Sequence, residues 1–454
     1  MSMPNPSQAP GKTLIVGLGR SGLSMARFLA GRGVSIAVTD TRDRPPELES
    51  LRSEMPEVAL FLGGFEPAAF DAAECLAVSP GVSVDEPLVR AAAARGVPVL
   101  GDIELFAREA RAPVVAITGS NGKSTVTTLV GEMARRAGLR AAVGGNLGEP
   151  ALELLDDDAE LYVLELSSFQ LETTASLAPR VATVLNLSPD HLDRYPSVEA
   201  YARAKARIFA GAACGVVNLD DPRVRAMGAG LPETIGFTLK APREGELGVA
   251  RVEGSEWLCR GADALMPAAG LGIRGRHNIA NALAALALGA ALGLPTAAML
   301  EVLRGFRGLP HRTEPVAERD GVRWINDSKG TNPGACVAAL EGLGAELGPG
   351  GRSVLIAGGD CKGADFGELR DVAARRARAV ILIGRDAPEL ERVLEGAVPL
   401  ERAASMDEAV RLAAARARPG DLVLLSPACA SFDMFRNYEH RGQAFCEAVR
   451  GLLG

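Results

Sequence analysis

The fold of the middle of the chain is indicated by the stretch Val114-Val115-Ala116-Ile117-Thr118-Gly119-Ser120-Asn121-Gly122-Lys123-Ser124-Thr125. Its first four residues are apolar and mostly β-branched, which predicts a buried strand, and the sequence has helical character from Val126 onward. The glycines between strand and helix let successive backbone N–H groups point at phosphate oxygens, and the helix N-terminus adds the positive end of its dipole. The stretch therefore predicts a loop that binds the phosphates of ATP.

This loop is shorter than the common P-loop, which has its first glycine where Ile117 stands here. Lys123 would reach the β- and γ-phosphates, and the Ser124 hydroxyl would bind Mg²⁺. The alternative is a Gly-rich turn with a chance Lys-Ser pair, which the flanking strand and helix disfavour. The residues expected around the phosphates are Gly119, Ser120, Asn121, Gly122, Lys123, Ser124 and Thr125.

Outward from this loop, short apolar runs alternate with longer Ala/Leu/Arg-rich segments of helical periodicity. This alternation predicts an α/β fold with parallel sheets wrapped by helices. The expected strands are 13–16, 35–39, 114–117, 161–166, 181–187, 354–357, 379–383 and 422–425. A length of 454 residues suggests about three domains. Pro-containing junctions place their boundaries so that the domains span 1–111, 112–309 and 310–454, with a small strand-and-turn elaboration at 228–272.

The composition limits the possible functions. A formal charge of -7 gives no broad electrostatic attraction for nucleic acid, so local sites must hold any anionic ligand. Residues 1–10 are polar and Pro-rich without an apolar signal-peptide core, and the longest Ala/Leu-rich run, 279–294, is shorter than the ~20 residues that span a bilayer. Seven scattered cysteines without a C-x-x-C pair favour neither structural zinc nor disulfides. We expect a cytoplasmic protein that does not insert into membranes.

A second phosphate site is predicted near the N-terminus. Gly17-Leu18-Gly19-Arg20-Ser21-Gly22 follows an expected strand, and Asp40 ends the next one, in the place where an acidic residue binds a ribose. A single G-x-G-x-x-G guarantees only a place for a diphosphate. A dinucleotide and a nucleotide-sugar both remain open on this motif.

Two strand ends near the phosphate loop carry candidate metal and substrate ligands. Glu165 ends an apolar strand where a second magnesium contact is expected, the alternative being a surface carboxylate. His191 is one of only four histidines and follows another strand end, beside two Asp and one Arg. A lone histidine is more often structural, but this position favours a function.

Lys205 lies on the apolar face of an expected helix that runs from Ser197 to Phe209. A bare ammonium is costly there. In one account the side chain extends along the apolar face until its ammonium reaches solvent at the rim of that face. The other is a neutral lysine that reacts with CO₂ to give a carbamate able to bind a metal. Spacing alone does not choose between them.

The last third of the chain repeats the pattern of polar residues after strands. Lys, Ser and Thr in these runs suit an acidic substrate with one or two carboxylates, although each run could be ordinary turn chemistry. The runs are 327–333, 358–363 and 425–433.

Eight ordered motifs together resemble the Mur ligase family of peptidoglycan synthesis, and within it the ligases that add D-glutamate. The short phosphate loop is the normal form in that family. The motifs are ITGSNGKST (117–125), ELSSFQL (165–171), NLSPDHLDRY (186–195), RHNIANA (276–282), GLPHR (308–312), NDSKGTNP (326–333), GGDCKGADF (358–366) and LSPACASFDMF (425–435).

The resemblance implies three domains: Rossmann-like, P-loop ATPase-type, and again Rossmann-like. It implies UDP-N-acetylmuramoyl-L-alanine and D-glutamate as substrates, ATP with two Mg²⁺ ions, and a monomer. The residues implied for the UDP substrate are Arg20, Ser21, Asp40, Thr41, Arg42, Ser79, Gly81, Asn146 and His191. Those implied for ATP, beyond the loop, are Asn278, Arg312 and Asp327. Those implied for Mg²⁺ are Ser124, Glu165, His191 and carbamoylated Lys205. Those implied around D-glutamate and the reacting groups are Lys329, Thr331, Asp360, Lys362, Ser431 and Tyr438.

By the same resemblance, Lys123, His191, Lys205, Lys329 and Lys362 are the catalytic residues. Tyr438 stands where the family often has Phe, so we expect it to pack rather than to add a hydrogen bond. The implied reaction passes through an acyl phosphate, and the three domains should close before it.

Four alternatives remain. A Mur ligase for L-alanine, a diamino acid or a dipeptide is the nearest, although the chain lacks the D-N-P-R run that resembles diaminopimelate recognition. Folylpolyglutamate synthase lacks an N-terminal nucleotide domain of this kind. An NAD-dependent oxidoreductase rests only on residues 17–40. A non-enzymatic P-loop module leaves Lys205, Lys362 and Ser431 unexplained.

Overall fold

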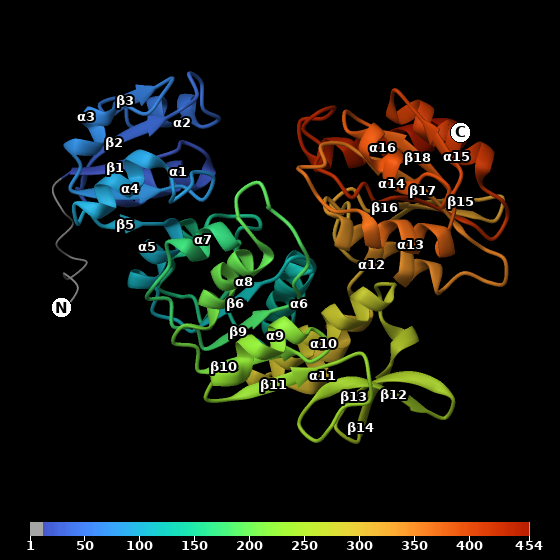
Figure 1. Ribbon diagram of the computed structural model, residues 1–454. Coiled ribbons are helices and arrows are strands. Elements are labelled where there is room, and N and C mark those ends of the chain that lie inside the picture. Colours follow the sequence, from blue (N-terminus) through green and yellow to red (C-terminus); the bar gives the residue numbers. More distant parts are fainter. Residues whose placement is uncertain (1–11, 454) are drawn as a thin grey trace.

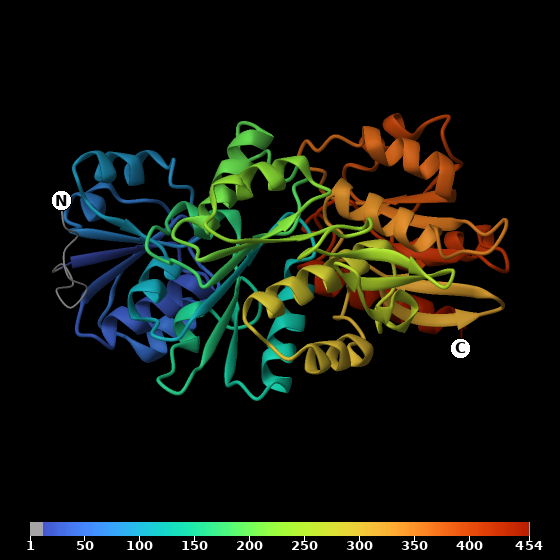
Figure 2. The same cartoon turned by 90° about the horizontal axis from the view of Figure 1, so that it is seen from below.

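The computed structural model describes residues 12–453, and the Pro-rich stretch 1–10 lies outside them. The described chain forms three α/β domains in sequence order (Figure 1). Turned by 90°, the molecule shows the N-terminal and C-terminal domains on opposite sides of the central one (Figure 2). The expected alternation of strands and helices around parallel sheets is confirmed.

The N-terminal domain has a five-stranded parallel sheet of order β3-β2-β1-β4-β5. Its strands are β1 (Lys12–Val16), β2 (Ser35–Asp40), β3 (Ala59–Leu62), β4 (Cys75–Val78) and β5 (Val99–Leu100). Its helices are α1 (Arg20–Ala30), α2 (Leu48–Glu54), α3 (Pro67–Asp71), α4 (Pro87–Ala94) and α5 (Asp102–Glu109). The sequence order reverses beside β1, and ligands of open α/β sheets bind at such a switch point.

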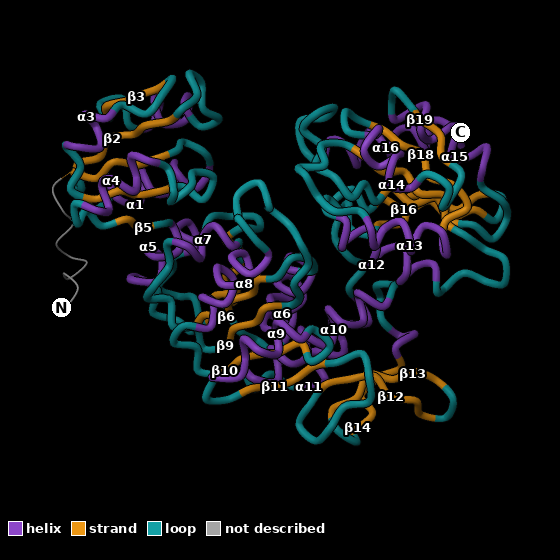
Figure 3. The backbone as a smooth tube through the Cα atoms, viewed as in Figure 1, coloured by secondary structure: helices purple, strands orange, loops and turns teal. Residues whose placement is uncertain are grey.

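The central domain has a nine-stranded sheet of order β14-β13-β12-β11-β10-β9-β6-β8-β7. Strands up to β12 pair in parallel, and β12 to β14 form an antiparallel extension at one end of the domain, as Figure 3 shows. This extension confirms the elaboration expected at 228–272. The strands are β6 (Val114–Thr118), β7 (Ala141–Gly145), β8 (Leu161–Glu165), β9 (Val181–Val184), β10 (Cys214–Asn218), β11 (Thr234–Phe237), β12 (Leu247–Val252), β13 (Ser255–Arg260) and β14 (Asp263–Pro267). The α-helices are α6 (Lys123–Arg136), α7 (Ser168–Glu172), α8 (Val198–Ala206), α9 (Pro222–Met227), α10 (Arg276–Ala291) and α11 (Thr296–Gly305).

The C-terminal domain has a six-stranded sheet of order β15-β16-β20-β17-β18-β19, parallel except for the β15–β16 edge. Its strands are β15 (Glu314–Arg319), β16 (Val322–Asn326), β17 (Ser353–Gly358), β18 (Ala377–Ile383), β19 (Leu400–Arg402) and β20 (Leu422–Leu425). Its helices are α12 (Pro333–Gly344), α13 (Gly367–Arg376), α14 (Ala387–Leu394), α15 (Met406–Arg416) and α16 (Tyr438–Leu453).

Several expected strands differ from the observed ones by one or two residues at an end, and three expected elements differ in ways that bear on the site. Strand β9 stops at Val184 rather than at 187, because the following residues bend toward the phosphate loop and Asn186 accepts hydrogen bonds from it. The helix expected at 197–209 ends its last turn as a 3₁₀ helix, with Ser197 as the predicted N-cap. The apolar run at 279–294 begins its helix three residues earlier, and Gly293 at φ +73° follows its end.

The cores of the three domains fix where the strand ends lie. Strands β6, β8 and β9 are wholly buried, and their carboxyl ends carry the phosphate loop, Glu165 and the turn with His191. Within residues 12–453, no helix has both the length and the apolar composition that crossing a bilayer requires. All seven cysteines are buried and free.

Candidate active site

The phosphate loop joins β6 to α6 in the predicted strand–loop–helix arrangement. Gly119 has φ +153° and Gly122 φ +83°, backbone conformations that side chains rarely adopt. The N–H groups of Ser120 and Asn121 donate to the carbonyl and side-chain oxygens of Asn186 at 3.0 and 2.9 Å. Hydrogen bonds to Asn186, which lies outside the loop and was not selected in the sequence analysis, therefore stabilise the loop conformation.

Lys123 places its ammonium at this loop. Its Nζ donates to the carbonyl oxygens of Gly119 and Ser120, both at 2.9 Å. Burial lowers the pKa of Lys123, while Glu165 and Asp190 raise it. A charged lysine at the start of α6 adds to the positive end of the helix dipole, which favours an anion here.

Ser124 and Glu165 meet as predicted. The Ser124 hydroxyl donates to Glu165 Oε2 at 2.5 Å, and Glu165 is only 3% exposed. Arg312, 188 residues further along the chain, donates to Ser124 Oγ at 2.6 Å. Asn146 donates to the other oxygen of Glu165 at 2.7 Å. One cluster thus joins predicted metal, ATP and UDP-substrate residues.

Lys205 is buried, as its helical position predicted, with 1% exposure. Its Nζ donates to Thr118 Oγ1 at 3.2 Å and lies 4.6 Å from the centre of the Tyr201 ring. Among the described residues, no carboxylate forms an ion pair with it. Burial lowers the pKa of Lys205 well below its usual range, helped by the charge of Lys123. The account in which the side chain extends to the rim is therefore wrong.

His191 lies in a strained turn with φ +54°. Its ring packs edge-on against Phe169, with 4.9 Å between the ring centres. Burial lowers the pKa of His191; Asp190 opposes this shift, and Lys362, Lys205 and Lys123 add to it. Positive charges from two domains therefore converge on this histidine.

A cavity of about 420 Å³ lies outside the carboxyl ends of β1, β2 and β4. Its lining includes the predicted residues Arg20, Ser21, Asp40, Thr41, Arg42, Ser79, Gly81 and Asn146. Asp40 accepts from Leu18 N at 2.7 Å and from both ends of the Arg42 fork at 2.8 and 2.7 Å. Burial raises the pKa of Asp40, but these hydrogen bonds outweigh it, so the pKa lies below the usual value. Gln170, which also lines the cavity, was missed by the sequence analysis.

A second cavity of about 290 Å³ lies between the phosphate loop, α10 and the C-terminal domain, and Asn278, Arg312 and Asp327 line it as predicted. The side chain of Asn278 accepts from Asn281 at 3.0 Å. Burial raises the pKa of Asp327 to about 6. His277 lines the same cavity, and burial lowers its pKa to about 4. The sequence analysis did not select Asn281 and His277 as lining residues, although the repeated polar positions of RHNIANA could have indicated both.

The residues predicted to lie around D-glutamate fall into two groups in the C-terminal domain. Lys329 lies over the Tyr438 ring at 3.9 Å, and burial lowers the Lys329 pKa to about 8. The expected packing role of Tyr438 stays a prediction, because its side chain also interacts with Glu439. Thr331 is in the same turn, with its N–H donating to the Lys329 carbonyl at 2.8 Å.

The second group lies where 358–363 meets 425–433. Asp360 pairs with Ala430 in an isolated antiparallel bridge, next to buried Ser431. Arg385, which the sequence analysis did not select, is 3.1 Å from Asp360 Oδ1. Lys362 is exposed and has φ +49°. Asp360 thus pairs with the backbone of Ala430, the residue before Ser431, while Lys329 lines the cavity beside α10.

Comparisons with known proteins give the family. The Mur ligase MurD-like N-terminal domain matches residues 11–101, the Mur ligase middle domain 117–289, and the Mur ligase glutamate ligase domain 311–429. This chain belongs to the Mur ligase family. A protein from Nitrosococcus oceani named UDP-N-acetylmuramoylalanine–D-glutamate ligase is 56% identical over 454 residues, which cover 100% of this chain and 99% of that one. A protein of the same name from Pseudomonas putida is 56% identical over 439 residues, 97% of each chain.

Solved structures agree on the fold. UDP-N-acetylmuramate–alanine ligase from Thermotoga maritima superimposes with a TM-score of 0.61 at 18% identity, covering 97% of this Mur ligase and 99% of that chain. The three-domain α/β fold is thereby confirmed. The three family matches each fall within one expected domain, and the boundaries at 112 and 310 stay predictions.

The donor set of this Mur ligase fits magnesium held jointly with a nucleotide. No group of three or more His, Cys, Asp or Glu side chains within residues 12–453 could hold a metal alone. Mg²⁺ is usually bound by one or two carboxylates together with substrate phosphates, and Ser124 with Glu165 supplies such a partial set beside the phosphate loop. No hydrogen bond or ion pair in the described chain joins His191 or Lys205 to that pair.

Proposed function

We propose that this Mur ligase joins D-glutamate to UDP-N-acetylmuramoyl-L-alanine in peptidoglycan precursor synthesis, converting ATP to ADP and phosphate. The observation that carries the proposal is 56% identity, over the whole chain, with a ligase of that name. ATP is the phosphoryl donor, in keeping with the family and with the loop at Gly119–Ser124. We expect a monomer that acts in the cytoplasm.

The two cavities suit this reaction because the Ser124–Glu165 cluster lies between them. The UDP moiety would occupy the N-terminal cavity, and the sugar with its L-alanyl carboxylate would extend past Asn146. ATP would occupy the cavity beside α10, with its γ-phosphate at Lys123. The carboxylate would attack the γ-phosphorus, ADP would leave, and an acyl phosphate would form.

The amine of D-glutamate would then attack the acyl carbon, lose a proton and expel phosphate, leaving an amide. Asp360, Lys362, Ser431 and Thr331 would hold the amino acid. Lys123, Lys329 and Arg312 would offset negative charge on the phosphoryl group and on the intermediate. His191 would bind the substrate at the junction of the domains.

We infer that Ser124 and Glu165 bind one Mg²⁺ and that His191 and carbamoylated Lys205 bind a second. When bound, the ions would neutralise charge on the transferring phosphoryl group. The burial of Lys205 without an acidic partner supports the carbamate, because a neutral amine is the form that adds CO₂. The product would be a carboxylate beside the Thr118 hydroxyl.

Amino-acid-dependent phosphate release tests the proposal. With ATP, Mg²⁺ and UDP-N-acetylmuramoyl-L-alanine, the purified protein should release phosphate when D-glutamate is added, and not with L-alanine or diaminopimelate. Lys123→Met should abolish the signal. A response to a different amino acid instead of D-glutamate would overturn the substrate assignment.

A further inference from the structure

Arg194 crosses from the central domain to the N-terminal domain. Its Nη1 donates to the Pro80 carbonyl at 3.1 Å and its Nη2 to the Val82 carbonyl at 3.1 Å. Nη2 also pairs with Glu172 at 2.9 Å, and both side chains are 14% exposed. The two carbonyls belong to the 79–82 loop, which lines the N-terminal cavity.

The same arginine also holds the turn that carries His191. Its backbone N–H donates to the His191 carbonyl at 2.9 Å, which helps to close a turn in which His191 has a left-handed conformation. Its guanidinium lies over the Phe169 ring, 4.3 Å from the centre, and Phe169 in turn packs against the His191 ring. Arg194 thus contacts both the 79–82 loop and the turn that carries His191, two segments that we propose bind the UDP substrate.

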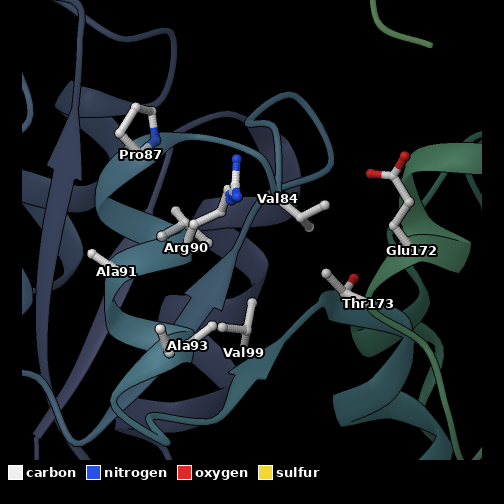
Figure 4. Close-up of a pocket in the computed structure, with 10 residues that line it drawn as sticks. Val84, Pro87, Arg90, Ala91, Ala93, Val99, Glu172 and Thr173 are labelled. Atoms are coloured by element: carbon white, nitrogen blue, oxygen red, sulfur yellow. The ribbon is translucent and has the colours of Figure 1, made fainter. Parts of the chain in front are cut away.

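Beside Glu172, a crevice separates the central domain from α4 of the N-terminal domain. This crevice of about 770 Å³ is lined by Val84, Arg90, Glu172 and Thr173. In Figure 4, Glu172 and Thr173 lie on the opposite side from Val84 and Arg90. The crevice lies between α4 and α7.

The two domains are joined elsewhere through α5, where Gln170 donates to Asp102 at 3.0 Å and the Ala175 N–H donates to Glu104 at 2.8 Å. Among the described residues, the hydrogen bonds that reach the 79–82 loop itself from the central domain are those of Arg194.

We propose that Arg194 is a positioning residue that fixes the 79–82 loop relative to His191, so that both segments hold the UDP substrate at once. This inference rests on the proposed function. Hydrogen bonds from a charged donor are stronger than neutral ones, and the guanidinium offers two forks in fixed directions. A lysine at 194 would keep the charge, but its compact ammonium would not match the two carbonyls and the ring together.

Arg207 provides a matched control. Its guanidinium also donates to two backbone carbonyls, those of Leu171 at 2.6 Å and Thr174 at 2.8 Å. Both acceptors lie in the central domain and outside the cavities of the substrates. Arg207→Gln therefore removes hydrogen bonds from a guanidinium to two backbone carbonyls near α7, and it leaves the contacts of the 79–82 loop unchanged.

The experiment combines steady-state kinetics with calorimetric binding of UDP-N-acetylmuramoyl-L-alanine. Arg194→Gln should raise the Kd and KM for this substrate about tenfold and change the KM for ATP less than about twofold, with Arg194→Lys between it and the wild type. Arg207→Gln should lower Tm but change none of these constants more than about twofold.

An unchanged Kd in Arg194→Gln, or an equal rise in Arg207→Gln, would overturn the positioning role while leaving the ligase intact. A wild type that binds the UDP substrate but forms no product with D-glutamate would count against the proposed function alone. A wild type that does not bind the UDP substrate would overturn both.

Discussion

Replacing Gly122 by alanine should impair ATP binding more than it impairs folding. Gly122 has φ +83°, and a Cβ there would stand 2.3 Å from Asn281 Oδ1. Ordinary contacts begin near 3.4 Å, so the buried Asn281 amide must move by roughly 1 Å. That movement breaks its 3.0 Å hydrogen bond to Asn278, which lines the cavity beside α10 where we propose that ATP binds.

The expected cost follows from two contributions. A left-handed alanine costs about 1–2 kcal/mol, of which the reduced freedom of the unfolded chain offsets about 0.4–1 kcal/mol. The lost hydrogen bond adds about 1 kcal/mol. Gly122→Ala should therefore lower the free energy of unfolding by about 2 kcal/mol and raise the KM for ATP about tenfold.

Gly138→Ala is the control, because Gly138 has φ +95° in the same domain and a Cβ there meets nothing within 4 Å. It should lose about 1 kcal/mol through strain alone and keep the wild-type KM for ATP. Urea denaturation and ATP-dependent phosphate release measure both quantities. An equal KM for ATP in the two variants would refute the assigned contact between the loop and α10.

Three further predictions concern the charged centre. Ser124→Ala removes the hydrogen bonds to Glu165 and Arg312, so the Mg²⁺ concentration for half-maximal rate should rise about 10–100-fold in a Mg²⁺ titration. Lys205→Met should lose most activity, and bicarbonate should stimulate wild type prepared without CO₂ but not the variant; wild-type rates in the variant would contradict the carbamate. Lys329→Met should raise the free energy of unfolding below pH 8 by at most about 3 kcal/mol, because the folded pKa is lowered from 10.5 to about 8. The penalty of burying this charge is fully present below pH 8 and is lost as the pH rises to 10.5, so urea denaturation at pH 7 and pH 10 should show the gain only at the lower pH.

The phosphate loop and the burial of Lys205 were predictable because each depends on the spacing of residues within one short segment. A strand followed by Gly119-x-x-Gly122-Lys123 specifies its own geometry, and helical periodicity put Lys205 on an apolar face. The carboxyl-end rule for parallel strands then placed Glu165 near the loop.

Contacts between distant segments were not predictable in this way. Arg312 reaches Ser124 across 188 residues, and Asn332 reaches Asn121 across 211 residues at 3.1 Å. Periodicity reports which face of an element is buried, not which element covers it. The antiparallel edge strand β15 was missed for a related reason, since its half-exposed pattern carries little apolar signal.

The central claim is that the loop at Gly119–Ser124 delivers a γ-phosphate to the L-alanyl carboxylate. Its most direct test uses UDP-N-acetylmuramoyl-L-alanine labelled with ¹⁸O in that carboxylate, with mass spectrometry of the phosphate released in the presence of ATP, Mg²⁺ and D-glutamate. An acyl phosphate requires one labelled oxygen to leave with each phosphate. Released phosphate without label, alongside an amide product that forms normally, would contradict the account.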